Sequence, residues 1–463
     1  MPSYIIKSFR GGESDYEDKG IPGSFKQGQS LDIRKKVDSL SCQQALVEEG
    51  SGVIVDLIKF IVPCSDGNSY LFGDASKIYK RTSAGTITLV YTDTGETGIK
   101  GACEWFLSSG NTYLFWATNT RLNCKQIPGN ASWTDVNALA GYPKTNLTAA
   151  TWHTMAQAVG TLQIANSDYL AMVGFDGSYT NAALNLFKKN TAKALLERGN
   201  SVIVGAPRSD NSPESNLVAW DTASLAYNDK KVILGGAVNA LIDTDLPLMQ
   251  VGTGGGLYYG DLVNIMPILS IDGGGYCNPG GVTTDEGLAL FGIYGNTSSR
   301  NGIWSYGRKK KNASHVLNFE YPLTCDEIGA VQKVGSDILL SYKSGSTYKM
   351  MKVNTAAKAT AYYYSLDLVP PAKANYLPTW GTIILSMKAL PASCQVEAFY
   401  RIDKTGNFVQ AKMEGSVSAF TTTGGKEAVF FAGEKGRIAE LELKLTPSAN
   451  TTPEIYKAEF YFQ

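Results

Sequence analysis

The sequence predicts an all-β protein with three parts: an extended N-terminal arm, a β-propeller of about seven blades and a C-terminal β-sandwich. Three observations predict this class. Short runs of Val, Ile, Leu, Phe and Tyr alternate with Gly, Asn, Asp and Ser clusters along the 463 residues, as in antiparallel strands joined by tight turns. Similar strands recur at a regular interval, and the last part of the chain alternates polar with apolar residues.

The repeat consists of seven apolar strands that each follow a polar turn. Their central residues are separated by 43, 49, 40, 47, 40 and 49 positions, the length of one four-stranded propeller blade. Six or eight blades also fit, and stacked β-sandwiches are the alternative. The seven strands are YLF at Leu71, TYLFWA at Leu114, TLQIAN at Gln163, SVIVGA at Ile203, PLMQVG at Gln250, LALFGIYG at Leu290 and DILLSY at Leu339.

A common order of strands is expected within each blade. The strand after each repeated one, such as SKIYKR, would be the third of its blade, with Lys77, Lys80 and Arg81 facing solvent or a partner. A polar outer strand would follow, such as TITLVYT at 86–92. The Gly- and Ala-rich pieces VGAP, VGTGG and FGIYG suit an inner strand at a crowded axis.

Composition places the domain boundaries. Residues 1–50 are mostly polar and predict an extended arm that can donate a strand to the first or last blade, because a propeller ring must close. The propeller is expected at 51–375, and the Pro-rich stretch at 369–381 predicts a stiff linker. Residues 376–463 predict the sandwich, in which leucines 441, 443 and 445 face the core and residues 440, 442 and 444 face away. The stretch at 180–199 fits either a helix or a strand and a loop.

The charges of the chain balance, with 42 basic and 42 acidic residues, and so give no indication of DNA contact. Two short basic runs, at 34–36 and 308–311, are expected to be solvated loops or, alternatively, contacts with an acidic partner. Seven widely spaced cysteines without CxxC pairs predict buried free thiols rather than a zinc site or a disulfide framework. No signal-peptide h-region or membrane span is expected.

Catalytic motifs are not found, so no catalytic, cofactor-binding or metal-binding residues and no cofactor are predicted. His153 beside Trp152 is expected to be a packed side chain, and His315 to lie on a loop. The glycine clusters GTGGGLYYGD and DGGGYCNPGG lack the spacing of a nucleotide-binding loop and are expected to form bends. The protein is therefore expected not to be an enzyme.

A propeller glycosidase is the enzymatic alternative, since such enzymes use paired carboxylates. The candidates lie near repeated strands, although tight turns also require aspartate. Four tryptophans could form a sugar platform but fit a blade core more simply. The carboxylate candidates are Asp74, Glu104, Asp176, Asp261 and Asp285, and the tryptophans are Trp105, Trp116, Trp220 and Trp304.

Taken together, these parts resemble a tailed-bacteriophage virion structural protein of the tail-nozzle, neck or tail-propeller type. The resemblance begins in FRGGESDYEDKGIPGSFKQGQSLDIRKKVDSLSCQQAL, with its aromatic-Gly-Gly, acidic patch, Gly-x-Pro-Gly and LDIRK. It continues in DGNSYLFGDASKIYKR and ends in LTPSANTTPEIYKAEFYF. It covers the whole chain in outline, and its motifs are specific only as a set.

The resemblance implies a non-enzymatic structural component of the virion, made in the host bacterial cytoplasm and assembled in the tail or neck through protein–protein contacts. Other virion proteins, associated with the tail, neck or portal, would be its partners, and a homo-oligomeric ring around the tail axis is expected. A receptor-binding or glycan-binding tail fibre or adhesin is the alternative function. A long repetitive shaft, typical of fibres, is not visible in the sequence.

Overall fold

The structure is a computed structural model that describes residues 2–14, 22–34, 39–187, 189–210, 212–308, 313–370 and 377–463. It divides into two compact units. The first comprises residues 48–302 and 323–352, and the second comprises 1–47, 303–322 and 353–463. The described residues contain one short 3-10 helix, η1 (Glu414–Ser416), and otherwise only strands, turns and bends. The predicted all-β class is confirmed.

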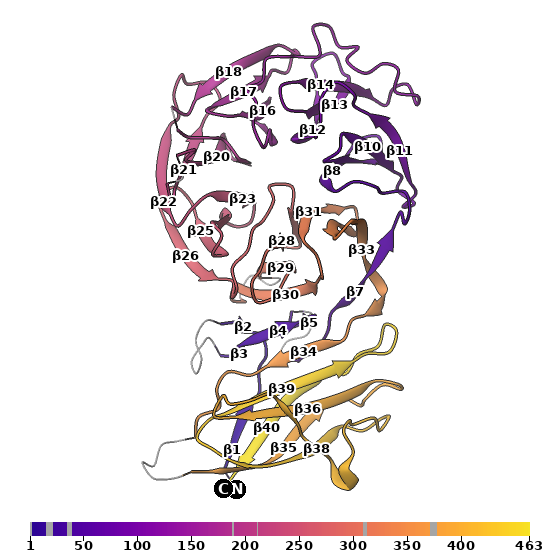
Figure 1. Cartoon of the computed structure of the whole chain (residues 1–463), viewed down its shortest axis with the longest axis vertical. Coiled ribbons are helices and arrows are strands. Elements are labelled where there is room, and N and C mark those ends of the chain that lie inside the picture. Colours follow the sequence, from indigo (N-terminus) through magenta and orange to yellow (C-terminus); the bar gives the residue numbers. More distant parts are fainter. Residues whose placement is uncertain are drawn as a thin grey trace. The chain divides into compact units, whose positions relative to one another are not determined.

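Seven small antiparallel sheets follow one another along the chain and form the blades of a propeller (Figure 1). The strand order within them is sequential from the axis outward, as predicted. The first three blades contain β8 (Ile58–Pro63), β9 (Ser69–Gly73), β10 (Lys77–Arg81) and β11 (Ile87–Thr92); β12 (Gly101–Phe106), β13 (Thr112–Ala117) and β14 (Leu122–Ile127); and β15 (Met155–Ala158), β16 (Thr161–Asn166), β17 (Tyr169–Val173) and β18 (Tyr179–Asn185).

The other four blades continue the same order, and the last of them ends with a strand from the N-terminal arm. They contain β19 (Ala194–Arg198), β20 (Ser201–Pro207), β21 (Glu214–Trp220) and β22 (Asp229–Leu234); β23 (Val238–Ile242), β24 (Leu248–Val251), β25 (Gly256–Gly260) and β26 (Ile265–Ser270); β27 (Val282–Asp285), β28 (Leu288–Ile293), β29 (Gly302–Gly307) and β30 (Val316–Pro322); and β31 (Glu327–Val334), β32 (Asp337–Ser344), β33 (Thr347–Lys358) and β7 (Gln44–Glu49).

The innermost strands close a ring. β8, β12, β15, β19, β23, β27 and β31 contact one another in this order, and β31 contacts β8. The apolar cores lie between neighbouring blades: one cluster joins Phe60 and Phe72 of the first blade to Leu114 and Trp116 of the second. The cluster that joins the last blade to the first includes Leu71 and Leu339. Burial of apolar surface between blades, rather than within one blade, therefore stabilises the ring.

The seven repeated strands predicted from the sequence are the second strands of the seven blades. TITLVYT is the outer strand β11, as expected, and the ambiguous stretch at 180–199 contains β18 and β19, with no helix in its described residues. The placement of the Gly- and Ala-rich pieces was wrong, because VGAP lies on β20 and FGIYG begins on β28, both second strands. The axis is instead surrounded by the strands that precede them.

The second blade has three strands rather than four. The outer edge of β14 is covered by residues 128–150, which have irregular structure. The backbones of Lys144 and Leu122 form two hydrogen bonds of 2.8 and 3.0 Å, and Asn137 N–H donates to Cys124 O at 2.8 Å. The side-chain oxygen of Asn137 also accepts from Cys124 N–H at 2.9 Å. This loop satisfies the edge groups of β14 that a fourth strand would otherwise bond.

The predicted strand donation from the arm is confirmed, because β7 is the outer strand of the last blade. Its final residue, Glu49, accepts two hydrogen bonds from Arg81, at 2.6 and 3.0 Å. Arg81, on the third strand of the first blade, also donates to Asp337 of the last blade at 2.8 Å. Arg81 was expected to face solvent or a partner, but its side chain is 2% exposed and is paired with carboxylates of the same chain. These carboxylates hold the pKa of Arg81 above its usual value, with Glu49 contributing most.

The N-terminal arm forms small sheets of its own in the second unit. β2 (Gly12–Glu13) pairs in parallel with β3 (Ser24–Phe25), and β5 (Leu31–Asp32) pairs with β6 (Ser41–Cys42). The Gly-Gly pair allows a close approach, since a Cβ on Gly11 would lie 2.2 Å from Ser24 N. Phe9 is fully buried with its ring 5.3 Å from that of Tyr363, in an edge arrangement. The motifs that carry the resemblance therefore build the arm.

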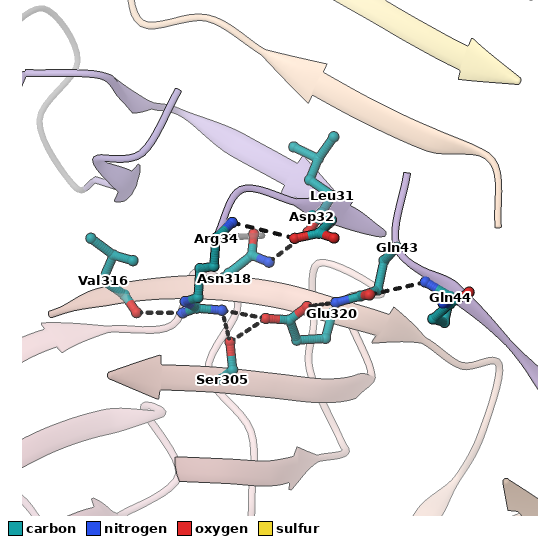
Figure 2. Close-up of polar contacts among 9 residues, drawn as sticks. All are labelled: Leu31, Asp32, Arg34, Gln43, Gln44, Ser305, Val316, Asn318 and Glu320. Atoms are coloured by element: carbon teal, nitrogen blue, oxygen red, sulfur yellow. Dashed lines mark hydrogen bonds and ion pairs between the residues drawn. The ribbon is translucent and has the colours of Figure 1, made fainter. Parts of the chain in front are cut away.

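Arg34 anchors the LDIRK segment to β30 and β29 (Figure 2). Its guanidinium donates to Glu320 at 2.5 Å, to Ser305 Oγ at 2.7 Å and to Val316 O at 2.8 Å. Gln43 donates to the other oxygen of Glu320 at 2.5 Å. The side chains of Arg34 and Glu320 are 8% and 4% exposed. Arg34 is thus a buried structural cation and not part of a solvated run; Lys35, Lys36 and residues 309–311 lie outside the described residues.

The β-sandwich of the second unit consists of two sheets around one apolar core. Leu441, Leu443 and Leu445 face this core, whereas Glu440, Glu442 and Lys444 face away, as predicted. Both arm strands and C-terminal strands build it. One sheet contains β1 (Ser3–Ile6), β40 (Ile455–Phe462), β35 (Thr379–Met387) and β38 (Glu427–Lys435), and the other contains β37 (Val409–Gln410), β36 (Gln395–Ile402), β39 (Ala439–Thr446), β34 (Ala361–Tyr364) and β4 (Gln27–Gln29).

Two further expectations concern thiols and the linker. All seven cysteines are unpaired, and five of them are buried, as expected of small apolar side chains. Much of the predicted stiff linker, residues 371–376, lies outside the described residues. None of the helical segments in the described ranges is long and apolar enough to cross a membrane.

Replacing Arg81 with methionine is expected to lower the free energy of unfolding by about 3 kcal/mol or more, because Glu49 would lose its buried partner. The urea midpoint of tryptophan fluorescence measures this. Arg208→Met is the matched control, since Arg208 pairs with Asp210 at the surface, and it should cost less than about 1 kcal/mol. Equal losses in both variants would contradict the buried closure.

Gly101→Ala is expected to destabilise the propeller by about 1–3 kcal/mol. A Cβ on Gly101 would lie 1.7 Å from the backbone oxygen of His153, so two adjacent blades would have to separate. Gly254→Ala serves as the control, because no heavy atom lies within 4 Å of its Cβ position. Thermal unfolding of both variants checks the packing; an unchanged melting temperature for Gly101→Ala would rule out this contact.

Candidate functional site at the axis of the propeller

A cavity of about 170 Å³ lies on the axis of the ring. All seven innermost strands, or residues directly before them, contribute to its lining. Most lining side chains are apolar, and the two polar ones are Thr154 and Gln332. Its volume is below the roughly 300 Å³ typical of small-molecule pockets. The lining contains no carboxylate, imidazole or thiol, so it offers no side chain that commonly acts as a general acid or base.

Polar side chains surround one end of this axis, where the innermost strands begin; we call them the collar. Contacts between them join consecutive blades. Thr154 Oγ donates to Lys193 O at 2.8 Å, and Lys193 Nζ donates to Asn239 Oδ1 at 2.7 Å. Asn278 Nδ2 donates to Glu327 at 2.8 Å. The collar comprises Lys59, Thr154, Lys193, Asn239, Asn278 and Glu327.

Lys59 completes the collar between the last blade and the first. Its ammonium forms an ion pair with Glu327, and it also lies 5.4 Å from the centre of the Trp152 ring. The Lys59 side chain is 9% exposed, so its ammonium is largely desolvated, whereas Glu327 is 29% exposed. A buried pair of this kind fixes the register of neighbouring elements more clearly than it adds stability.

His153 is fully buried between the second and third blades. Its Nδ1 lies 2.7 Å from Ala165 O, and its Nε2 lies 3.0 Å from Asn119 O. Burial lowers the pKa of His153, and the two carbonyl oxygens oppose that shift. The prediction of a packed side chain is confirmed. His315 stacks on Tyr306 with 5.8 Å between ring centres, just before β30.

The five candidate carboxylates lie in five different blades, and the surroundings of each one differ. Asp74 is exposed in the turn after β9. Glu104 accepts from Ser65 N–H at 2.8 Å and from Ser65 Oγ at 2.6 Å. Asp285 forms an ion pair with Lys333. The latter two contacts tie adjacent blades together.

Asp176 and Asp261 cap tight turns, as turn chemistry predicts. Hydrogen bonds from Ser178 hold the pKa of Asp176 below its usual value. The backbone N–H groups of Asn264 and Val263 do the same for Asp261. Both carboxylates are therefore ionised at neutral pH, whereas the general acid of a glycosidase needs a raised pKa.

The four tryptophans of the possible sugar platform are core residues. Their exposed fractions are 7% for Trp105, 0% for Trp116, 2% for Trp220 and 0% for Trp304. They lie on strands of three different blades, with Trp105 and Trp116 both in the second. A stacking platform needs exposed and adjacent rings, so these residues do not form one.

The glycine clusters form bends at the fifth and sixth blades. Positive φ angles occur at Gly252, Gly255 and Gly273–Gly275, a conformation in which side chains are strained. Gly275 N–H donates to Thr253 O at 2.8 Å, which ties the two clusters together. Within the described parts of the chain, no group of three or more His, Cys, Asp or Glu side chains could hold a metal ion.

Sequence reasoning did not single out the collar. Its members belong to the first strands, which vary more in sequence than the second strands from which the repeat was recognised. A polar residue at the start of each blade was the available signal, as in Lys59, Lys193 and Asn239. Their contacts join different blades, so the partner of each could not be inferred from the sequence.

Comparison with known proteins gives only structural similarities, since no protein-family model and no curated protein matches the chain. The β-propeller domain of Cps50 (Swd1) from Myceliophteria thermophila is 10% identical with a TM-score of 0.48, covering 66% of this chain and 98% of that chain. The WD40 β-propeller domain of Doa1 is 12% identical with a TM-score of 0.46, covering 66% and 97%. The propeller assignment comes from the strand order and ring contacts described above.

The buried His153 makes stability depend on pH. Because burial lowers its folded pKa below the value of 6.5 for the exposed group, the unfolded chain takes up a proton first. Stability should therefore fall as the pH drops below about 6.5. We expect a lower urea midpoint at pH 5.5 than at pH 7.5, and a smaller difference in His153→Gln. An equal difference in the variant would assign the effect to other groups.

Proposed function

We propose that the chain is a non-enzymatic structural component of a tailed-bacteriophage virion that assembles in the tail or neck through protein–protein contacts. The observation that carries the non-enzymatic part is the lining of the axial cavity, which holds no acid, base or thiol. The collar side chains link neighbouring blades, and so do the candidate carboxylates Glu104 and Asp285. Such a molecule offers a stiff framework with loops on both ends of the ring, which suits repeated docking.

The virion assignment is supported by the resemblance in the arm at 9–46, in the first blade at 66–81 and in the terminal segment at 445–462. The first and last of these segments help to build the second unit: β4 joins one sheet of the sandwich, and β40 lies in the other. A resemblance carried by segments that build sheets favours shared construction over shared catalysis. The implied site of function is the virion, after synthesis in the host cytoplasm, with tail, neck or portal-associated proteins and further copies of the chain as partners.

The alternative functions have less support. A glycan-binding fibre or adhesin would use exposed aromatic rings, but Trp105, Trp116, Trp220 and Trp304 are buried. A glycosidase would bring two carboxylates to within roughly 5–10 Å across a bound sugar, whereas the candidates are distributed over five blades.

Purified virions of the encoding phage test the proposal. Mass spectrometry should detect the chain in intact particles, and density for a seven-bladed ring should lie at the neck or tail. Density on side fibres, together with binding on a glycan array, would support adhesion instead. Absence of the chain from purified virions would refute the structural role, and hydrolysis of a glycan that is lost in Glu104→Gln or Asp285→Asn would refute the non-enzymatic assignment.

A further inference from the structure

Lys193 is a partly buried cation in the collar that lacks an acidic partner. Its ammonium donates to the amide oxygen of Asn239, which is 3% exposed. Across the described ranges, no carboxylate lies within ion-pair distance of Lys193. The titratable group that affects the pKa of Lys193 is the thiol of Cys277. Burial raises the pKa of this thiol to about 12, so the thiol is neutral at neutral pH and is not an anionic partner.

Other buried lysines of the ring differ from Lys193 in this respect. Lys59 pairs with Glu327, and Lys125, whose side chain is 2% exposed, pairs with Asp135 at 2.8 Å. Removing an ammonium from water is costly unless it is paired. Burial accordingly lowers the pKa of Lys193. For Lys59 and Lys125, neighbouring carboxylates compensate the cost of desolvation. For Lys193, an anion from outside the chain would do so.

The position of Lys193 is fixed before any ligand arrives. Its backbone oxygen accepts from Thr154 Oγ. The Asn239 amide is itself held, since its Nδ2 donates to Gln250 Oε1 at 2.7 Å and to Gly252 O at 3.3 Å. An ammonium has three N–H donors, so the bond to Asn239 leaves two of them. Such preorganisation reduces the entropic cost of binding.

We propose that Lys193 is the binding site for one carboxylate group at the collar end of the propeller axis. A single point charge with two remaining donors matches a monoanion, whereas phosphate groups are commonly bound by several donors together. Ala194 and Leu195, which follow Lys193, line the axial cavity together with Leu241 and Val282. A carboxylate on a short aliphatic group therefore fits this end of the ring better than a bare inorganic anion. This inference does not depend on the virion assignment.

Unfolding in different anions tests the proposal on the full chain. Sodium butyrate, at constant ionic strength against chloride, should raise the urea midpoint of the wild type, because a ligand that binds only the folded state stabilises it. Lys193→Gln should lose this increment. Lys231→Gln is the matched control, since Lys231 is exposed on β22, and it should keep the increment. Phosphate at the same ionic strength should give a smaller increment than butyrate.

Amine labelling of the wild type gives a second measurement, in case Lys193→Gln does not fold. An acylating reagent followed by peptide mass spectrometry should modify Lys193 several-fold more slowly with butyrate present, and Lys230 and Lys231 at unchanged rates. A glutamate-rich peptide replaces butyrate in a second arm; protection by the peptide alone would assign the carboxylate to a partner protein rather than a free acid. No protection by either, or stronger protection by phosphate, would overturn the proposal.

Discussion

Closure of the ring is the constraint on which the propeller depends. Each apolar core is shared by two neighbouring blades, so an open ring would expose both halves of the core between the first and last blades. The closing contact combines apolar packing between the first and last blades with the ion pairs of Arg81 to Glu49 and Asp337. Glu49 belongs to a strand that precedes the first blade in the chain. Folding of the last blade thus requires the two ends of the repeat to meet.

The second unit follows a related principle, in which early and late parts of the chain share one core. Phe9, Phe25 and Leu31 of the arm pack with Leu443 and Phe460 of the sandwich. Arg34 adds a buried positive charge. Its hydrogen bonds to Glu320 and Ser305 require a fixed orientation of the guanidinium group. Because both units need residues distant in sequence, loop-closure entropy leads us to expect that their contacts form after the local hairpins.

The sequence was sufficient to predict the class, a propeller of about seven blades, the strand donated by the arm and the two faces of β39. These features depend on local alternation and on the repeat interval. The inner strands were misplaced because second strands are the most apolar and dominate the repeat. Arg81 and Arg34 were expected to face solvent or a partner, since the sequence gives no sign that Asp337 and Glu320, 256 and 286 residues away, approach them in the fold.

The candidate site was less predictable for the same reason. Turn aspartates such as Asp176 and Asp261 were correctly attributed to turn chemistry, because their partners are two or three residues away. The collar joins residues such as Lys59 and Glu327, which lie in neighbouring blades but are 268 residues apart in the sequence. The lack of a carboxylate near Lys193 among the described residues is likewise a property of the fold, since acidic residues are frequent in the sequence.

Hydrogen exchange of the wild-type chain tests ring closure most directly. The amides of β7 and of the facing part of β33 are bonded only if the arm completes the last blade. The account predicts that the 44–49 segment exchanges as slowly as the innermost strands β8 and β31. Rapid exchange of 44–49, at the rate of exposed turns, would show that the ring is not closed by the arm.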